Sequence, residues 1–247
     1  MLYAQAPAPC SNPRIRRDFR EVDKAGDWIK VVAAYQKMKS TGRILYYANL
    51  HNENFSKVHN TGKGNFATWH RAFLWEFENE LRKVSGDPSL TIPYIDWGAE
   101  ASAFQGLIDK SAAITPKFYA QQNGQCLTGQ IYDSFALPKG DSRGTCIYRQ
   151  NTTTGTQQEF VLSPGWADID NQVTKFSDFT KFSNFFENGF HNEVHRKFGG
   201  ILGTSSSPFD PLFFAHHGFV ESVFQNWQFV HNYSAVAADF KDPITLS

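Results

Sequence analysis

Apolar residues recur three or four positions apart in two separate parts of the chain, which is the spacing of one face of a helix. In the first part this spacing covers residues 22–39, 43–58 and 69–84. In the second part it covers residues 184–197 and 211–230. Asp210 and Pro211 are well placed to begin the last helix, because Asp is a good N-cap and Pro fits the first helical position.

Residues 86–183 lack a regular pattern, and we expect them to form long surface excursions. They separate four amphipathic segments into two pairs, about 43–84 and about 184–230. This arrangement is typical of a bundle that carries ligands on its inward faces. We therefore predict a mainly α fold, an antiparallel four-helix bundle with long irregular loops and little strand, in one domain over residues 1–247.

The composition fits a globular protein and excludes several other classes. Apolar residues make up 41% and charged residues 19% of the 247 positions. The 24 Lys and Arg balance the 24 Asp and Glu, so no basic stripe predicts nucleic-acid binding and no polybasic run or long apolar stretch predicts membrane binding. The 23 Phe indicate a core or pocket built from flat rings.

The cysteines and the start of the chain bear on its compartment. Cys126 and Cys146 bracket a polar loop, where a disulfide would contribute roughly 3 kcal/mol, although two free thiols are the alternative. Cys10 then has no cysteine left to pair with in this chain, and it is either free or paired outside the chain. The start MLYAQAPAPC resembles the trimmed front of a secreted chain rather than a signal peptide. Secretion also agrees with three N-glycosylation sequons, at Asn54, Asn151 and Asn232.

Two histidines four residues apart, His191 and His195, lie on one face of a predicted helix, as two ligands of one metal ion require. Asn192 follows the first of them, so the pair is not the zinc-protease motif, which needs Glu there. His216 and His217 lie on the next predicted helix, and either residue can supply a third imidazole. A surface histidine pair is the alternative, which the neighbouring phenylalanines disfavour.

The first half of the chain repeats this arrangement with His51, His59 and His70. Single histidines at such positions are more often core residues, but three on adjacent elements, mirrored by three downstream, predict paired three-histidine metal sites. Imidazole suits copper, zinc, iron and nickel, and the absence of Cys and carboxylate ligands disfavours zinc fingers and di-iron carboxylate centres. Spacing alone does not choose the metal.

Several motifs together resemble those of one known family: FATWHR (66–71), PYIDW (93–97), HNEVH (191–195) and DPLFFAHH (210–217). They are similar to those of the tyrosinase family of type-3 copper proteins, which includes catechol oxidases and molluscan haemocyanin units. The start NPRIRR (12–17) is similar to that of fungal members, and the short fungal polyphenol oxidases look most similar. The resemblance covers nearly the whole chain.

The resemblance implies two copper ions as cofactors, O₂ as co-substrate and small phenols as substrates. It assigns His51, His59 and His70 to the first copper and His191, His195 and His217 to the second, with His216 as a neighbour. The sequence departs from the family at two positions. Lys57 stands where many fungal members carry a cysteine that is bonded to a histidine, and Glu221 stands where Asp is usual.

The resemblance also implies a role for Asn192 and Glu187, which would orient a water molecule that takes the proton of a monophenol. The alternative is that Asn192 faces solvent and Glu187 only favours a helix N-terminus. We predict a polyphenol oxidase that oxidises o-diphenols to o-quinones and hydroxylates monophenols. No segment after His217 is long enough for the C-terminal cap of latent members, so we expect constitutive activity.

Three other interpretations remain open at this point. A catechol oxidase or o-aminophenol oxidase would share the copper ligands but lack monophenol hydroxylation. A haemocyanin-like O₂ carrier would share them and would need a cap. A structural helical bundle with core histidines would bind no copper at all.

Overall fold

The structure is a computed structural model, and it describes residues 14–61, 65–105, 111–115, 117–119, 126–132, 145–149 and 162–232. Its α-helices are α1 (Phe19–Lys24), α2 (Trp28–Ser40), α3 (Arg43–Val58), α4 (Asn65–Ser85), α5 (Trp97–Phe104), α6 (Ile169–Thr174), α7 (Phe179–Phe186), α8 (Asn192–Phe198) and α9 (Leu212–Val230). Four short turns of other helix types are η3 (Pro164–Asp168), η4 (Glu187–His191), η5 (Gly200–Gly203) and η6 (Ser207–Phe209). Asp18 and Tyr94 form an isolated parallel bridge.

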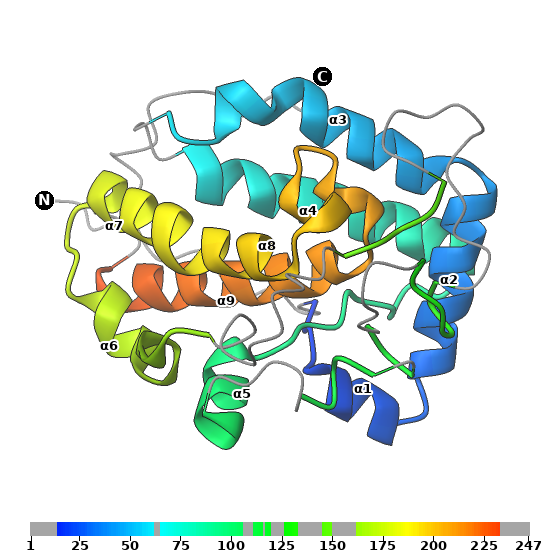
Figure 1. Cartoon of the computed structure of the whole chain (residues 1–247), viewed down its shortest axis with the longest axis horizontal. Coiled ribbons are helices and arrows are strands. Elements are labelled where there is room, and N and C mark those ends of the chain that lie inside the picture. Colours follow the sequence, from blue (N-terminus) through cyan, green and yellow to red (C-terminus); the bar gives the residue numbers. More distant parts are fainter. Residues whose placement is uncertain are drawn as a thin grey trace, which may run out of the picture.

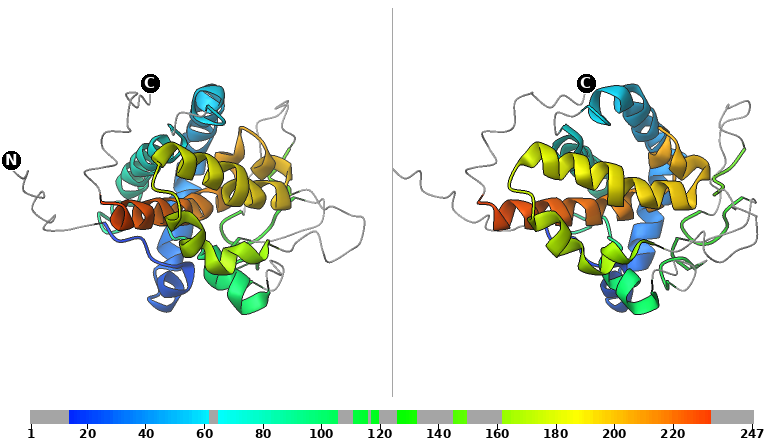
Figure 2. Two further views of the ribbon diagram at one scale, coloured as in Figure 1. Left: turned by 90° about the vertical axis from the view of Figure 1, so that its left-hand side faces the viewer. Right: turned by 60° about the vertical axis from the view of Figure 1, so that its left-hand side comes forward.

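The helices form two antiparallel pairs (Figure 1). Many aromatic side chains are buried in the core between them. α3 runs back along α4, and the α7–α8 segment runs back along α9, which both side views also show (Figure 2). The pairs meet where α4 packs on α9, and there the rings of Phe77 and Phe214 stack 3.5 Å apart. Phe182 of α7 stacks on Trp227 of α9 at 4.7 Å. The predicted mainly α bundle is confirmed.

The first half of the chain follows the predicted pattern with two differences. α3 has the predicted bounds and begins directly after Gly42, whose φ of 73° ends α2. The predicted helix over 22–39 is instead two helices, α1 and α2, because the chain turns at Gly26 with a φ of 76°. α4 begins at Asn65, so the last part of the predicted loop 59–68 is helical.

The expectation that residues 86–183 form surface excursions was wrong where short helices lie and bury large side chains. α5, α6 and most of α7 lie there, and Trp97 and Trp166 are fully buried. Two aspartates cap these helices: Asp96 accepts a hydrogen bond from the Ala99 amide and Asp178 accepts one from the Lys181 amide. Short helices around single buried tryptophans carry too few apolar positions to show a clear period.

The predicted disulfide is confirmed, since Cys126 and Cys146 are bonded with their Cα atoms 5.5 Å apart. Cys10 lies outside the described residues. Two of the three sequons can be placed: Asn54 is buried in α3 and donates to the Leu50 carbonyl, so a glycan has no room there, whereas Asn232 is exposed. Asn151 lies outside the described residues. Among the helices that the structure describes, none is long and apolar enough to cross a membrane.

A buried ion pair that the sequence did not indicate fixes the start of α9. Arg149 and Asp210 are both 0% exposed, and the guanidinium donates to both carboxylate oxygens of Asp210, at 3.0 and 3.1 Å. Asp210 also accepts hydrogen bonds from the Tyr132 hydroxyl and from the Leu212 amide. It therefore binds the first amide of α9, although the N-cap is Pro211, one residue later than predicted. The disulfide joins the two segments that carry Tyr132 and Arg149.

Gly200 allows the segment with Arg149 to lie against the chain that follows α8. Its φ is 54°, and an added Cβ would collide with the Tyr148 carbonyl oxygen and lie 2.8 Å from the Arg149 Cα. Any other residue would therefore be strained and would push these two segments apart. This close approach shapes η5, whose Leu202 carbonyl contacts the histidine cluster described next.

Candidate metal centre

Three histidines of the first helix pair meet at their Nε2 atoms. His51 of α3 lies with its Nε2 3.3 Å from the Nε2 of His59 and 3.3 Å from the Nε2 of His70. His59 caps the C-terminus of α3, and His70 lies in the second turn of α4. All three are buried. The structure thus brings together the first group of histidines that the sequence singled out.

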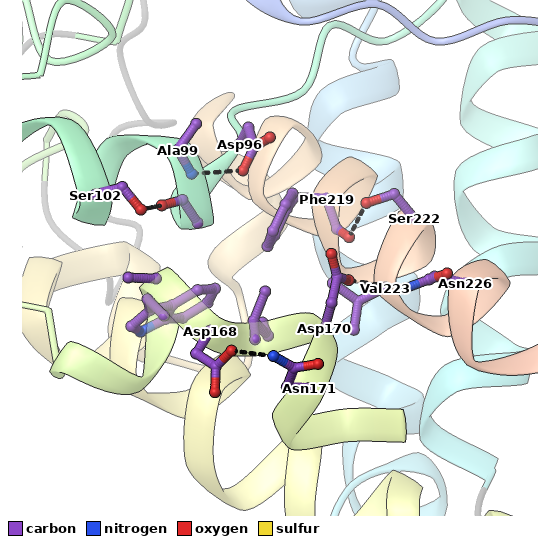
Figure 3. Close-up of a pocket in the computed structure, with 14 residues that line it drawn as sticks. Asp96, Ala99, Ser102, Asp168, Asp170, Asn171, Phe219, Ser222, Val223 and Asn226 are labelled. Atoms are coloured by element: carbon purple, nitrogen blue, oxygen red, sulfur yellow. Dashed lines mark hydrogen bonds between the residues drawn. The ribbon is translucent and has the colours of Figure 1, made fainter. Parts of the chain in front are cut away.

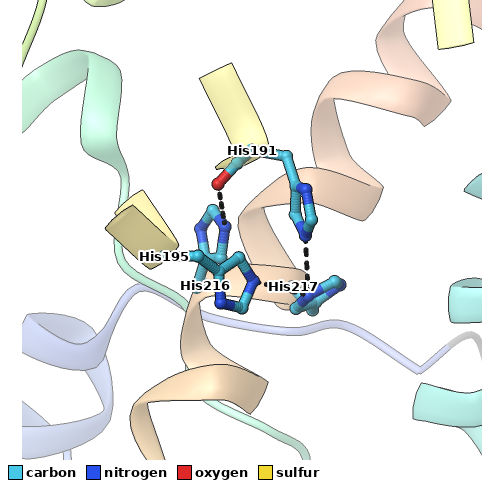
Figure 4. A group of neighbouring side chains, drawn as sticks. All are labelled: His191, His195, His216 and His217. Carbon is cyan, nitrogen blue, oxygen red and sulfur yellow. Dashed lines mark hydrogen bonds between the residues drawn. The ribbon is translucent and has the colours of Figure 1, made fainter. Parts of the chain in front are cut away.

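Four histidines of the second pair form a matching group (Figure 4). The Nε2 of His217 lies 3.3 Å from the Nε2 of His191 and 3.4 Å from that of His195. His216 is used differently, because the Trp97 indole donates to its Nδ1 at 3.0 Å. Its Nε2 must then carry the hydrogen and donate to the His191 carbonyl, 3.3 Å away. Both nitrogens of His216 are occupied, which favours His217 as the third donor.

The two groups face each other across the contact between α4 and α9. The rings of His70 and His217 stack with centroids 4.4 Å apart, and those of His59 and His191 stack at 5.8 Å. Phe66 fills the space beside them, with its ring 4.4 Å from that of His191. The six rings therefore belong to one centre with two halves.

The Nδ1 atoms show which nitrogen of each ring is free to bind a cation. Four of these atoms face backbone carbonyl oxygens, which only accept hydrogen bonds: His51 faces Ser205, His70 faces Phe66, His191 faces Glu187 and His195 faces Leu202. The Nδ1 of His59 faces a carboxylate oxygen of Glu187 instead, 3.1 Å away. In neutral rings these Nδ1 atoms carry the hydrogen, so each Nε2 presents a lone pair.

The short contacts between Nε2 atoms are therefore contacts between lone pairs. Lone pairs 3.3 Å apart repel unless a cation lies among them, and imidazole nitrogens are ligands for copper and zinc. The donor set thus fits two metal ions, one for each group. The Nδ1 of His217 is buried and has no hydrogen-bond partner among the described residues, so the position of its Nε2 beside those of His191 and His195 is what marks it as a donor.

Burial keeps these rings neutral. Burial, aided by the neighbouring His59, lowers the pKa of His51 to about 3, and burial lowers the pKa of His195 to about 4. Burial and the adjacent histidines also lower the pKa values of His70, His191 and His217 well below their ordinary value. Neutral imidazole is the form that binds a metal ion.

These shifts predict that the metal-free protein is sensitive to acid. Below about pH 6.5 the histidines of the unfolded chain become protonated. In the folded chain His51 stays neutral down to about pH 3 and His195 down to about pH 4. The free energy of unfolding should thus fall by roughly 1.4 kcal/mol per histidine for each pH unit below this value. Thermal melting of chelator-treated protein between pH 7 and pH 5 measures this fall.

Copper-loaded protein is the control for this measurement. A nitrogen that holds a metal ion cannot be protonated, so the melting temperature of the loaded form should fall only at lower pH. A metal-free protein whose melting temperature stays constant from pH 7 to pH 5 would contradict the prediction.

A small cavity of about 200 Å³ opens onto the centre. Its wall includes histidines of both halves, together with Phe55, Asn60, Asn192, Arg196, Thr204, Ser205 and Ser207. Glu187 lies behind this wall, 2% exposed, and its Oε1 accepts a hydrogen bond from the Asn60 amide at 2.8 Å. Glu187 contacts His59, so favouring a helix N-terminus is not its only interaction. Asn192 lines the cavity.

A second, larger cavity of about 620 Å³ lies on the other side of α9, between α5 and α6 (Figure 3). Asp96, Asp168 and Asp170 line it, and each of these carboxylates accepts a hydrogen bond from a neighbouring group: the Ala99 amide, Asn171 and Asn226, respectively. No histidine lines this cavity, so the chemistry of the imidazoles belongs to the smaller one.

Glu221, the residue that departs from the family pattern, does not contact a histidine in the described structure. It pairs with Arg16 and with Arg71, whose Nε lies 3.0 Å from one of its oxygens. Arg16 also binds the buried Glu78 of α4 at 2.7 Å. Glu221, whose side chain is longer than that of the usual Asp, therefore links α9 to Arg71 of α4 and to Arg16.

Comparison with known proteins gives a consistent result. The family model described as the common central domain of tyrosinase matches residues 34–229. The tyrosinase of Streptomyces antibioticus is 29% identical over 227 residues, and that of Streptomyces glaucescens is 30% identical over 228 residues. Each alignment covers 82% of this chain and 78% of the relative.

Solved structures share the fold. A variant of the polyphenol oxidase from Thermothelomyces thermophila superposes with a TM-score of 0.62 at 18% identity, over 94% of this chain and 75% of that one. The tyrosinase from Burkholderia thailandensis gives a TM-score of 0.59 at 17% identity, over 88% of this chain and 62% of that one.

Proposed function

The chain belongs to the tyrosinase family of copper-dependent phenol oxidases, and from this premise we propose that it hydroxylates monophenols as well as oxidising o-diphenols to o-quinones. The observation that carries the proposal is that imidazoles from both halves of the centre and Asn192 line one small cavity. The cavity is smaller than most pockets for drug-sized ligands, which suits a single aromatic ring.

We further propose that each histidine group holds one copper ion. His51, His59 and His70 would hold the first, within residues 43–84, and His191, His195 and His217 the second, within residues 184–230. The convergence of the Nε2 atoms within each group supports this assignment. When bound, the copper pair supplies the electrons that reduce O₂, and the protein supplies orientation and a dry pocket.

The residues of this chain would then bind the phenol and manage its proton. A phenol that enters the cavity would contact residues of its wall, among them Phe55, His191 and His195. Asn192, with Glu187 behind it, would orient a water molecule that takes the phenolic proton, which monophenol hydroxylation requires. The carboxylate of Glu187 is buried and close to the cavity wall, which supports its role as the final base.

One observation favours the narrower alternative, a catechol oxidase or o-aminophenol oxidase. Glu187 Oε1 already faces two groups, the Nδ1 of His59 and the amide of Asn60. A carboxylate engaged in this way is held in place and has less freedom to bind a water molecule. O₂ uptake measurements distinguish the two functions.

The test compares O₂ uptake by the copper-loaded protein with tyrosol and with the matching catechol. We expect uptake with both, and Glu187→Gln and Asn192→Ala should lower the tyrosol rate by roughly 10²–10⁴-fold, the usual contribution of a general base, while the catechol rate changes little. Asp168→Asn, in the other cavity, is the control. Uptake with the catechol alone would establish the narrower function, whereas variants with an unchanged tyrosol rate would refute the roles of Glu187 and Asn192.

A further inference from the structure

His59 differs from the other histidines of the centre in how its backbone is held. His51, His70, His195 and His217 lie within helices, and His191 ends the η4 turn. His59 is the residue after the end of α3, with extended backbone, and Asn60 beyond it has a φ of 53°. Helical backbone therefore does not fix the direction of the His59 side chain, so its orientation must come from side-chain contacts.

The ring of Phe55 supplies the first of these contacts. Phe55 lies one helical turn before His59, and the two rings stack with centroids 4.4 Å apart and an interplanar angle of 21°. Phe66 contacts the same imidazole at 5.4 Å. Phe55 is 36% exposed while His59 is 7% exposed, so the phenyl ring covers the imidazole from solvent.

Glu187 supplies the second contact, which restricts a different motion of the ring. Its Oε1 lies 3.1 Å from the Nδ1 of His59 and also accepts the Asn60 amide hydrogen at 2.8 Å. A flat stack fixes the plane of a ring but leaves it free to turn within that plane, whereas a hydrogen bond to one ring atom stops this turning. Together the two contacts direct the Nε2 of His59 towards that of His51.

We propose that Phe55 is a positioning residue for His59, which with Glu187 holds this imidazole in the orientation that binds the first copper ion. The proposal rests on the proposed function, since it assumes a copper ion at His51, His59 and His70. Loss of the phenyl ring opens one face of the imidazole to solvent and lets it tilt out of line. Outer contacts of metal ligands typically change affinity 10–100-fold, and we expect a loss of this size, confined to the first site.

The experiment measures how much copper stays bound per chain when loaded protein is dialysed against increasing chelator. Phe55→Leu keeps bulk but removes the flat face, and Phe55→Tyr keeps the face. Tyr46→Ala removes another exposed ring of α3, away from the cavity, and serves as the control. We expect Phe55→Leu to lose one copper ion at a 10–100-fold lower chelator concentration than the wild type, with Phe55→Tyr and Tyr46→Ala close to the wild type.

Combining Phe55→Leu with a histidine variant of either site shows which site is affected. With His217→Ala, which weakens the second site, Phe55→Leu should also weaken the copper that remains. With His70→Ala, which weakens the first site, Phe55→Leu should change nothing. Melting of the metal-free proteins reports whether each variant folds.

Each result has one meaning. A wild-type chain that binds no copper would refute the proposed function itself. A wild-type chain that binds two copper ions, with Phe55→Leu holding both equally well, would overturn only the role of Phe55. Loss of both ions together, with a lower melting temperature of the metal-free variant, would also overturn it, because Phe55 would then act through the fold.

Discussion

Replacing Arg149 with methionine should lower the free energy of unfolding by about 3–5 kcal/mol, because it leaves a buried carboxylate without its partner. Burial alone would lower the pKa of Arg149, but Asp210 and Tyr132 hold it above the ordinary value, so this side chain is a cation inside the protein. The variant would also lose its hydrogen bonds to the Tyr119 carbonyl and the Tyr132 hydroxyl. A chain of this size should then melt roughly 6–20 °C lower.

Thermal and denaturant unfolding of the metal-free protein measure the effect of Arg149→Met. The matched control is Lys117→Met, which removes an exposed ion pair with Asp23 and should cost less than about 1 kcal/mol. Because Asp210 binds the first amide of the helix that carries His217, we also expect weaker copper binding in Arg149→Met. Equal stability of the two variants would show that the buried pair contributes no more than the exposed one.

Replacing His217 with alanine should abolish phenol oxidation and leave one copper ion per chain. The three-histidine group around His191 would keep only two Nε2 donors. If a four-ligand protein site binds its metal with about 10–16 kcal/mol, one ligand contributes roughly 3 kcal/mol, or more than a hundredfold in affinity. Both halves of the centre must be filled for two-electron chemistry, so the loss of one ion stops the reaction.

Metal analysis and O₂ uptake with a catechol check this expectation for His217→Ala. His231→Ala is the control, since this histidine binds the Thr174 carbonyl outside the centre. His216→Ala should keep both ions but melt at a lower temperature, because it breaks the link from Trp97 to the His191 carbonyl. The opposite pattern, with His216→Ala losing copper and His217→Ala keeping it, would exchange the two assignments.

The fold was predictable where a long helix buries one full face. The 16 residues of α3 show this regularity, and their bounds agree with the prediction. α4 begins earlier than predicted because Phe66 turns inward against His191 and its carbonyl accepts the hydrogen of His70, contacts that no local pattern reveals. α5 and α6 were missed because each is short and packs around one or a few large side chains.

The grouping of the histidines was predictable from their spacing, but what holds them was not. Positions four apart on a helix fix His191 and His195 on one side, and the structure places them there. Arg149 and Glu187 act on residues far away in sequence, so no periodicity identifies their contacts. Phe55 lies one helical turn before His59, but spacing alone does not show that their rings stack. The η4 turn over Glu187–His191 has π geometry, which often marks functional sites but has no sequence signature.

Each histidine group comes from a short stretch of chain, since His51 and His70 are 19 positions apart and His191 and His217 are 26 positions apart. Closing such short loops costs little entropy, so each half can form early and on its own during folding. The stack of His70 on His217, by contrast, joins residues more than half the chain apart and forms only when α4 docks on α9. A newly made chain can thus gather its metal ligands one half at a time while remaining unable to oxidise anything, itself included, until folding is complete.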